Sequence, residues 1–339
     1  MKTDKFTFGI IGAGLMGKRR AESLMRFPES KLVSVADVDK ENAENLAKKY
    51  GCKWTNSYLD ILNDSGVNCI IVSVINNKLY EITKKAIKSG KHVFVEKPVA
   101  TNPEEISELV DLSKNNNVIV KVGFNHRFLP AIIKAKELFY NNEIGELMFI
   151  KSTYGQKSRI GFEKEWRSKK NLSGGGELLD QGVHVIDLCH LFMKNIIDVG
   201  GIISNLFWKS NVDDNDFFYI KDEDDKIAFI HTSSSLWRNT FQFHIHGTKG
   251  IIEIEGLRGH YGLPKLKLLK RNDEKSKEVG VYQFDEKVFN FSDEELTFIS
   301  EMENFLNAIK EKEEINGDLI DAKNTLTVVF DLYGKMMGE

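Results

Sequence analysis

An acid and an imidazole that could work together occur in the stretch from Ser173 to His190, which reads SGGGELLDQGVHVIDLCH. Apolar residues recur after the glycines at nearly helical spacing, so the stretch predicts a helix. Asp180 and His184 are four positions apart and would share one face of that helix. A carboxylate beside an imidazole can hold a general base in one tautomer and stabilise its protonated form. The alternative is a buried helix in which the pair is only a satisfied polar contact.

A second group of candidates lies near the start of the chain. Residues 6–11 have the pattern of a short buried strand, and a G-x-G-x-x-G loop and a helical stretch follow at once. This order is the dinucleotide-binding fingerprint, in which the pyrophosphate meets the helix N-terminus. The expected loop contacts are Gly12, Gly14, Leu15, Met16 and Gly17. The next strand, 31–36, ends in Asp37, whose carboxylate would accept the ribose hydroxyls and repel a 2′-phosphate. We therefore expect NAD, with NADP less favoured; a Gly-rich turn without a ligand is the alternative.

The alternation of strand and helix patterns continues as far as residue 124. The further strands and helices are predicted at 68–73, 79–89, 91–95, 103–115 and 118–122. Strands that alternate with helices of this length form a parallel, doubly wound sheet, and ligands bind at the carboxyl ends of its strands. Residues 1–124 are therefore expected to form an α/β Rossmann domain.

Polar residues follow three of these strands, at the edge where a ligand would bind. They are Asn76, Glu96 with Lys97, and Asn125 with Arg127. Pro98 favours an extended conformation of Lys97, whose ammonium could then reach a hydroxyl beside the nicotinamide. Asn76, Glu96 and Lys97 are therefore expected to contact the cofactor. A surface ion pair at a strand end is the other interpretation of Glu96 and Lys97.

Taken together, these motifs resemble those of one family. They are Gly12-x-Gly14-x-x-Gly17, Glu96-Lys97-Pro98, Gly123-Phe-Asn-His-Arg-Phe128, and Gly-Gly-Gly-Glu177 followed by Asp180-Gln-Gly-Val-His184. Their order and spacing are similar, over nearly the whole chain, to the glucose–fructose oxidoreductase / inositol dehydrogenase / rhizopine-catabolism (Gfo/Idh/MocA) family of NAD(P)-dependent oxidoreductases. The combination is much more specific than any single motif.

The resemblance implies a catalytic role for each of three residues. His184 is implied as the general base when an alcohol is oxidised, and its unperturbed pKa of about 6.5 suits proton transfer at neutral pH. Asp180 would orient the imidazole, and Lys97 would hydrogen-bond the reacting oxygen and stabilise a developing alkoxide. Relatives commonly have Thr/Ser-Pro-Asn-x-x-His after the fourth strand, where this chain has VINNKL at 74–79. The Asn is kept while the Pro and His are absent, which leaves the contacts on the nicotinamide side open.

Residues 125–339 are predicted to form a second domain for substrate binding and oligomerisation, with a large, mostly antiparallel open sheet. Consecutive strand patterns with short turns indicate antiparallel pairing. These strands lie at 199–207, 215–221, 226–235, 239–246 and 250–255. Apolar residues alternate with polar ones in the fourth of them, so one face needs a cover. The apolar residues are Phe241, Phe243 and Ile245. The resemblance implies a second subunit as the cover, giving a homo-dimer or homo-tetramer. Two C-terminal helices, 294–312 and 320–337, could pack against either domain.

Candidate substrate contacts come from the same region. They are Asn125, Arg127, Arg159, Trp166, Arg167 and His184. An Arg can pair with a carboxylate or phosphate and a Trp can stack on a sugar, although ordinary packing is an alternative. This region looks similar to family members that oxidise sugars or nucleotide-activated sugars, and the arginines would suit a diphosphate. We expect NAD-dependent oxidation of a secondary hydroxyl of a sugar or nucleotide sugar, for example a UDP-sugar. Oxidation of an inositol or free sugar, and a non-catalytic NAD(H)-binding regulator, are the alternatives.

The composition argues against several other classes of protein. The net charge of −3 disfavours nucleic acid as a partner, and no apolar run is long enough for a membrane span. The N-terminus has no signal-peptide pattern, and the three cysteines are widely spaced, so we expect a cytoplasmic protein without disulfides. Asp180, His184, Asp187 and His190 lack the spacing of a metal site, so no metal is expected.

Overall fold

The computed structural model describes residues 6–157, 161–272, 283–292, 294 and 296–337. The chain forms two compact units, each assembled from three segments. The first unit consists of Met1–Asn125, Asn171–Gly174 and Glu295–Leu326, and the second of His126–Lys170, Gly175–Glu294 and Thr327–Glu339. The first unit therefore takes in two later segments beyond the boundary expected after residue 124. No helix among the described residues is long and apolar enough to cross a membrane.

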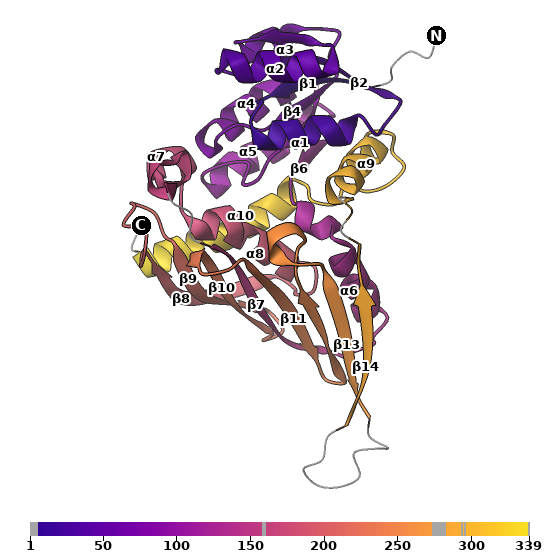
Figure 1. Cartoon of the computed structure of the whole chain (residues 1–339), viewed down its shortest axis with the longest axis vertical. Coiled ribbons are helices and arrows are strands. Elements are labelled where there is room, and N and C mark those ends of the chain that lie inside the picture. Colours follow the sequence, from indigo (N-terminus) through magenta and orange to yellow (C-terminus); the bar gives the residue numbers. More distant parts are fainter. Residues whose placement is uncertain (1–5, 158–160, 273–282, 293, 295, 338–339) are drawn as a thin grey trace. The chain divides into compact units, whose positions relative to one another are not determined.

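The first unit is built on a six-stranded parallel sheet with the order β3-β2-β1-β4-β5-β6 (Figure 1). The strands are β1 (Phe6–Ile11), β2 (Ser30–Ala36), β3 (Lys53–Thr55), β4 (Cys69–Val72), β5 (His92–Val95) and β6 (Val120–Val122). The helices are α1 (Leu15–Leu24), α2 (Lys40–Tyr50), α3 (Tyr58–Asn63), α4 (Asn76–Lys88), α5 (Pro103–Asn115) and α9 (Thr297–Ile309). Every residue of β4 is buried, as expected for a central parallel strand covered on both faces. The predicted doubly wound parallel sheet is confirmed.

The local signals at helix ends explain why these helices begin and end where they do. Asn102 caps α5, because its side chain accepts a hydrogen bond from the N–H of Glu105 at 2.9 Å, and Pro103 is the first helical residue. Asp39 caps α2 in the same way, and Gly51 ends it in the left-handed conformation. The helices α2 and α3 and the short strand β3 were not among the predicted elements.

The second unit is built on an eight-stranded sheet with the order β14-β13-β12-β11-β7-β10-β9-β8 (Figure 1). The strands are β7 (Leu147–Lys157), β8 (Ile196–Ser204), β9 (Asn215–Asp222), β10 (Ile227–Leu236), β11 (Thr240–Gly247), β12 (Gly250–Glu255), β13 (Lys265–Arg271) and β14 (Phe284–Asn290). All neighbouring strands are antiparallel except β7 and β10, which are parallel. The mostly antiparallel sheet is confirmed, and β13 and β14 extend it beyond the predicted strands.

The two faces of this sheet differ in how they are covered. The apolar residues Phe241, Phe243 and Ile245 of β11 are buried, with Phe243 in ring contact with Phe192 of the same unit. Helices α6 (Pro130–Tyr140) and α8 (Val183–Cys189) lie on this face (Figure 1). The expectation that a second subunit covers the apolar face of β11 is therefore wrong, because the chain covers it itself.

The spacing predicts one continuous α-helix for the segment that carries Asp180 and His184. The structure differs from this prediction. A short helix, α7 (Lys170–Ser173), precedes the three glycines; a π-helix then spans Leu178–Gly182 and leads directly into α8. Asp180 thus lies in the π-helix and His184 in α8. Single π-helical turns of this kind are rare in proteins, and those that occur frequently lie at functional sites.

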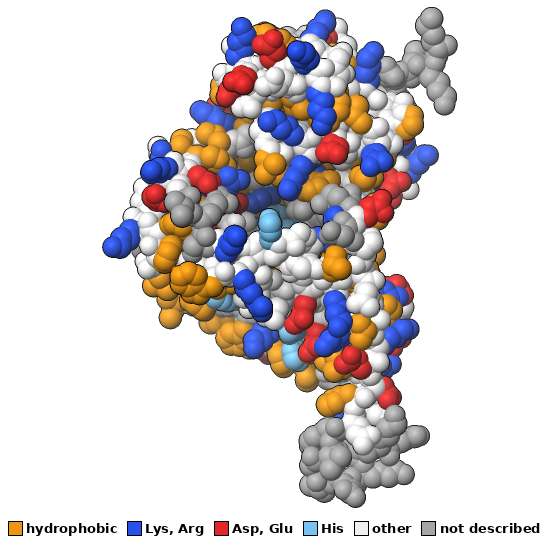
Figure 2. All heavy atoms as spheres, in the orientation of Figure 1, with side chains coloured by type: hydrophobic (Ala, Val, Ile, Leu, Met, Phe, Trp, Pro, Cys, Tyr) orange, Lys and Arg blue, Asp and Glu red, His pale blue; other side chains and the backbone are white. Residues whose placement is uncertain are grey.

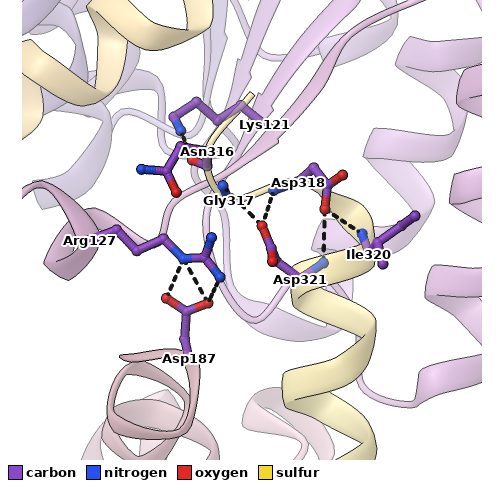
Figure 3. Close-up of polar contacts among 8 residues, drawn as sticks. All are labelled: Lys121, Arg127, Asp187, Asn316, Gly317, Asp318, Ile320 and Asp321. Atoms are coloured by element: carbon purple, nitrogen blue, oxygen red, sulfur yellow. Dashed lines mark hydrogen bonds and ion pairs between the residues drawn. The ribbon is translucent and has the colours of Figure 1, made fainter. Parts of the chain in front are cut away.

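The N-terminus of α10 (Leu319–Met337) is capped by two aspartates (Figure 3). Asp318 Oδ1 accepts hydrogen bonds from the backbone N–H groups two and three residues on, at 2.8 Å each, and Asp321 Oδ2 accepts two from the residues before the helix, at 3.1 Å each. These bonds satisfy N–H groups that have no partner within the helix. The buried Lys121 of β6 donates to the carbonyl oxygen of Asn316 and to the side chain of Asn304, which ties this segment to the six-stranded sheet.

Candidate active site

The glycine loop after β1 is tightly packed at two positions and open at a third. A Cβ on Gly12 would lie 2.3 Å from the carbonyl oxygen of Ser73, and one on Gly17 would lie 2.0 Å from that of Gly12. A Cβ on Gly14 would meet no atom within 4 Å. The backbone at Gly14, immediately before α1, is therefore open to a ligand, and the start of a helix is a favourable place for a phosphate.

Asp37 lies beside this loop at the end of β2. Its Oδ2 accepts a hydrogen bond from the N–H of Ala13 at 2.6 Å, and its Oδ1 accepts one from Asp39 at 2.9 Å. The first turn of α1, where Leu15 is exposed and Met16 half-buried, contains no acidic residue that would oppose an anion. The residues present therefore fit a dinucleotide, with the pyrophosphate at the start of α1 and a ribose at Asp37.

Asn76 comes after β4, the neighbour of β1, and Lys97 comes after β5, the next strand of the sheet. Because β1, β4 and β5 are adjacent and parallel, the glycine loop, Asn76 and Lys97 follow the same edge of the sheet. Asn76 is the first residue of α4, and its Nδ2 donates to the carbonyl oxygen of Ser173 at 2.8 Å. Lys97 is half-buried, and the peptide bond between it and Pro98 is cis.

Glu96, the residue before Lys97, forms a buried ion pair with Arg20 of the same unit. This arginine of α1 is fully buried; its Nε lies 2.7 Å from Oε1 of Glu96, and its Nη1 lies 2.5 Å from Oε2 of Glu301 in α9. Its guanidinium also lies 4.2 Å from the ring centroid of Phe94. Burial alone lowers the pKa of Arg20, but the charges of Glu301 and Glu96 outweigh it and raise the pKa. A cofactor contact for Glu96 stays a prediction; its ion pair fixes the backbone that leads to Lys97.

In the second unit, Asp180 lies beside Arg167. The Nε of Arg167 is 3.3 Å from Oδ2 of Asp180, and its guanidinium lies 4.5 Å from the ring centroid of Trp166. Three of the predicted residues therefore lie together in this unit. The ion pair with Arg167 is a contact of Asp180 that the sequence did not indicate.

His184 is buried and stacks on a second histidine. The rings of His184 and His126 have centroids 4.1 Å apart and an interplanar angle of 25°. The ring of Tyr154, in β7, lies 6.4 Å from that of His184 and 5.3 Å from that of His126. Burial raises the pKa of Tyr154 well above its usual value, and the neighbouring Tyr261 and acidic groups raise it further. The phenol of Tyr154 is therefore neutral, and its ring lies beside both histidines.

A pocket of about 350 Å³ adjoins this aromatic cluster within the second unit. Two of its walls touch the cluster: the ring of Tyr261 lies 5.7 Å from that of Tyr154, and the ring of Phe241 lies 6.0 Å from that of His126. Further polar side chains of its lining are Arg238, Asn239, Gln242, Glu255 and His260. Such a mixture of donors and acceptors suits a ligand with several hydroxyl groups.

The remaining predicted substrate contacts have different surroundings. Arg127 is buried and forms a bidentate ion pair with Asp187, with Nη2 2.6 Å from Oδ1 and Nε 2.8 Å from Oδ2 (Figure 3). This pair accounts for the burial of Arg127 without a ligand, so its substrate contact stays a prediction. Asn125 is half-buried at the start of the 3₁₀ turn Asn125–Phe128, and Arg159 lies outside the described residues. Among the described residues, no three His, Cys, Asp or Glu side chains gather to hold a metal ion.

Sequence reasoning missed His126, Tyr154 and Arg20. His126 lies between the two residues that were chosen from its motif, Asn125 and Arg127, and only the fold brings it onto His184. Tyr154 lies in β7, and an aromatic residue in a strand is ordinary. Arg20, in a predicted helix, gave no signal because its partners Glu96 and Glu301 are 76 and 281 residues away.

Comparison with known proteins agrees with this architecture. Residues 6–124 match the family model described as "Oxidoreductase family, NAD-binding Rossmann fold", and residues 132–253 match the GFO/IDH/MocA C-terminal domain. Glucose-6-phosphate 3-dehydrogenase of Bacillus subtilis is 34% identical over 56% of this chain and 54% of its own length. The scyllo-inositol 2-dehydrogenase (NAD(+)) of Bacillus subtilis is 30% identical over 74% of this chain and 73% of its own length.

Solved structures share the fold over nearly the whole chain. Levoglucosan dehydrogenase in complex with NADH and L-sorbose has a TM-score of 0.85 at 22% identity, covering 98% of this chain and 97% of its own. Several curated relatives are matched over only about half of their length, including glucose-6-phosphate 3-dehydrogenase at 54%. The family models cover both domains, and the chain belongs to the GFO/IDH/MocA oxidoreductase family, with an NAD-binding Rossmann fold as its first domain.

Proposed function

We propose that the chain is an NAD-dependent dehydrogenase that oxidises a secondary hydroxyl of a sugar or a related polyol to a ketone. The observation that carries this proposal is the edge of the six-stranded sheet, where a loop open at Gly14 follows β1 and the ammonium-bearing Lys97 follows β5, two parallel strands with β4 between them. A dinucleotide site and a cation on one sheet edge are the parts that alcohol oxidation needs from this unit. The second unit supplies a base, a carboxylate and a polar pocket.

The reaction removes a hydride from carbon and a proton from the attached oxygen. NAD, when bound, accepts the hydride. His184 takes the proton as general base, and the stacked ring of His126 fixes the plane of its imidazole. Asp180 stabilises the imidazolium that results, and Arg167 limits the movement of that carboxylate through the ion pair at 3.3 Å. Lys97 donates a hydrogen bond to the reacting oxygen and stabilises its developing negative charge.

The substrate class follows from the polar pocket and from the relatives. Three of the matched dehydrogenases are named for glucose 6-phosphate, levoglucosan and scyllo-inositol, which are polyhydroxylated rings. A nucleotide-activated sugar is the finer candidate within this class, since Arg127, Arg159 and Arg167 could bind a diphosphate. The ion pairs of Arg127 with Asp187 and of Arg167 with Asp180 favour a substrate without a diphosphate. An inositol or free sugar is therefore the stronger candidate, and a non-catalytic NAD(H)-binding regulator is the remaining one.

A panel assay tests the function and the cofactor together. The purified chain, with NAD or NADP, is offered free sugars, sugar phosphates, inositols and UDP-sugars while the absorbance of the reduced cofactor is followed. We expect turnover with NAD and a sugar or inositol, and a kcat/KM at least about tenfold lower with NADP because Asp37 repels a 2′-phosphate. Turnover with UDP-sugars alone would support a nucleotide-activated sugar as the substrate, with its diphosphate bound by the arginines. Tight NADH binding with no turnover on any substrate would contradict the proposal and favour the regulator.

We also propose that the chain forms homo-oligomers through the uncovered face of the eight-stranded sheet. Phe229 is 58% exposed, Ile202 63% and Phe217 45%, and they lie on β10, β8 and β9. Figure 2 has hydrophobic side chains gathered below the strands that Figure 1 labels β8 to β10. Exposed apolar patches of this kind mark interaction sites. We keep the cytoplasm as the expected location.

Placing a charge on this face should separate the subunits. Phe229→Glu would put a carboxylate into the proposed apolar contact, so we expect its mass by light scattering to fall to that of one chain at micromolar concentration. Trp237→Glu, at a 92% exposed residue just beyond β10, is the matched control and should keep the wild-type mass. A wild-type protein that is already a single chain would rule out the oligomer.

A further inference from the structure

A fully buried carboxylate lies beneath the segment that carries Asp180 and His184. Asp213 precedes β9, and its side chain accepts three hydrogen bonds within the second unit. Oδ1 accepts from the N–H of Gly176 at 3.0 Å and from the hydroxyl of Tyr333 at 2.8 Å, and Oδ2 accepts from the N–H of Leu178 at 2.8 Å. The carboxylate therefore binds the backbone on both sides of Glu177.

The backbone of Asp213 also holds this segment. Its carbonyl oxygen accepts the N–H of Glu177 at 3.1 Å, so three consecutive N–H groups, those of residues 176 to 178, all bind one residue. A Cβ on Gly176 would lie 2.1 Å from the carbonyl oxygen of Asp213, and a Cβ on Gly175 would lie 2.5 Å from the hydroxyl of Tyr333. Two glycines of the GGG run are thus required by the close approach of Asp213 and Tyr333.

These bonds continue into the two proposed catalytic side chains. The N–H of Asp180 donates to the carbonyl oxygen of Gly176 at 2.9 Å, so the residue that Asp213 binds sets the position of Asp180. The π-helix that contains Asp180 runs directly into α8, where His184 is the second residue. A displacement at Gly176 would therefore be passed along a continuous helical segment to both side chains.

Asp213 shares its buried site with a second carboxyl group, that of Asp216 in β9. Burial raises the pKa of Asp216 well above its usual value, and the negative charge of Asp213 raises it further; Glu177 adds to this, while the hydrogen bond from Thr232 at 2.9 Å opposes it. Burial also raises the pKa of Tyr333, so that group is neutral as well. Burial raises the pKa of Asp213 as well, but its hydrogen bonds from Leu178, Tyr333 and Gly176 oppose that rise and stabilise its ionised form.

We infer that Asp213 is a positioning residue for the proposed dehydrogenase: it fixes the backbone from Gly176 to Leu178 and thereby the placement of Asp180 and His184. The catalytic part of this inference rests on the proposed function, whereas the anchoring of the segment does not.

Asp213→Asn tests the inference against a matched control. The amide would keep the size of the side chain but would turn one acceptor oxygen into an NH₂ group that faces a backbone N–H. Asp222→Asn is the control, because Asp222 is also a buried carboxylate that accepts backbone N–H groups, those of Lys194, Asp224 and Lys226, at a turn that carries no proposed catalytic residue. We expect Asp213→Asn to lower kcat by about 10²-fold with the KM for NAD little changed, and Asp222→Asn to keep kcat within about twofold.

A readout that does not need turnover is hydrogen exchange of the amides of residues 176–184. Asp213→Asn should lose their protection, whereas Asp222→Asn, which leaves the three donors to Asp213 in place, should keep it. Unchanged protection in Asp213→Asn, or an equal loss of kcat in Asp213→Asn and Asp222→Asn, would overturn the inference. If the wild-type chain turns over no substrate, only the proposed function fails, and hydrogen exchange still decides the anchor.

Discussion

Lys97→Met should slow substrate oxidation by a factor of about 10² to 10³ while the affinity for NADH stays within a few-fold of wild type. Methionine has nearly the shape of lysine but no charge and no N–H donor, so it cannot stabilise negative charge on the reacting oxygen. His184→Ala should cost about 10² to 10⁴ in kcat, because no group then takes the proton. Steady-state kinetics with the best substrate of the panel, and a fluorescence titration with NADH, measure the two effects separately.

The control for Lys97→Met is Lys88→Met, at an exposed lysine that ends α4. It should have wild-type rates, since α4 runs away from the sheet edge where Lys97 follows β5. The expected loss should appear in kcat more than in KM, because Lys97 acts chiefly on charge that develops in the transition state. A Lys97→Met variant that binds NADH and keeps its wild-type rate would show that the cation takes no part in the chemistry.

The parts of the fold that local patterns specify could be predicted from the sequence. The buried strand, glycine loop and helix at the N-terminus depend on adjacent residues, and β1 spans Phe6–Ile11, the range that its apolar run predicts. The start of α5 likewise depends on adjacent residues, among them Asn102 and Pro103. In contrast, α2 is mostly polar and buries only Ala43, Leu46 and Ala47, and α3 has six residues, which is too few for a periodic pattern to identify a helix.

The interactions that position the site could not be predicted, because they join residues far apart in the sequence. The spacing of Asp180 and His184 predicts one α-helix, yet a π-helical turn replaces its first part. Asp213 accepts hydrogen bonds from the N–H groups of Gly176 and Leu178 at the start of that turn, from 37 and 35 residues away. A motif search finds the three glycines but not the carboxylate that they approach.

Open sheets pose a similar problem, since alternation indicates which face of a strand is apolar but not what covers it. Phe241 and Phe243 of β11 pack under the chain's own helices, whereas Phe229 of β10 is 58% exposed on the other side. In the second unit, the apolar residues of β11 therefore belong to the monomer core. The surface available to a partner is set by the neighbouring strands β8, β9 and β10.

The largest effect on stability is expected from Arg20→Met, which removes the charge between Glu96 and Glu301. Breaking a buried ion pair from one side leaves carboxylates without compensation, and this typically costs about 3 to 5 kcal/mol. Arg19→Met is the control: Arg19 is an exposed neighbour on the same helix, and its replacement should change the free energy of unfolding by no more than about 1 kcal/mol. Urea denaturation of the three proteins at one pH, followed by far-UV circular dichroism, measures the difference.

The pH dependence of this loss separates an ionic cause from a cavity. Burial raises the pKa of Glu301 even in the wild-type chain, although Arg20 and Lys121 oppose the shift. Without Arg20 the pKa should rise further, so the folded chain would hold protons that the unfolded chain releases above about pH 4.3. The stability that this proton uptake contributes is fully present below that pH. It falls as the pH rises toward the folded pKa, by about 1.4 kcal/mol per pH unit for each carboxyl group with a raised pKa. Arg20→Met should therefore lose more stability at pH 8 than at pH 5, whereas a cavity would cost the same at both. Adding Glu301→Leu to Arg20→Met should recover part of the lost free energy of unfolding at pH 8. If nothing is recovered, the role of Arg20 is to pack against Phe94 and not to compensate charge.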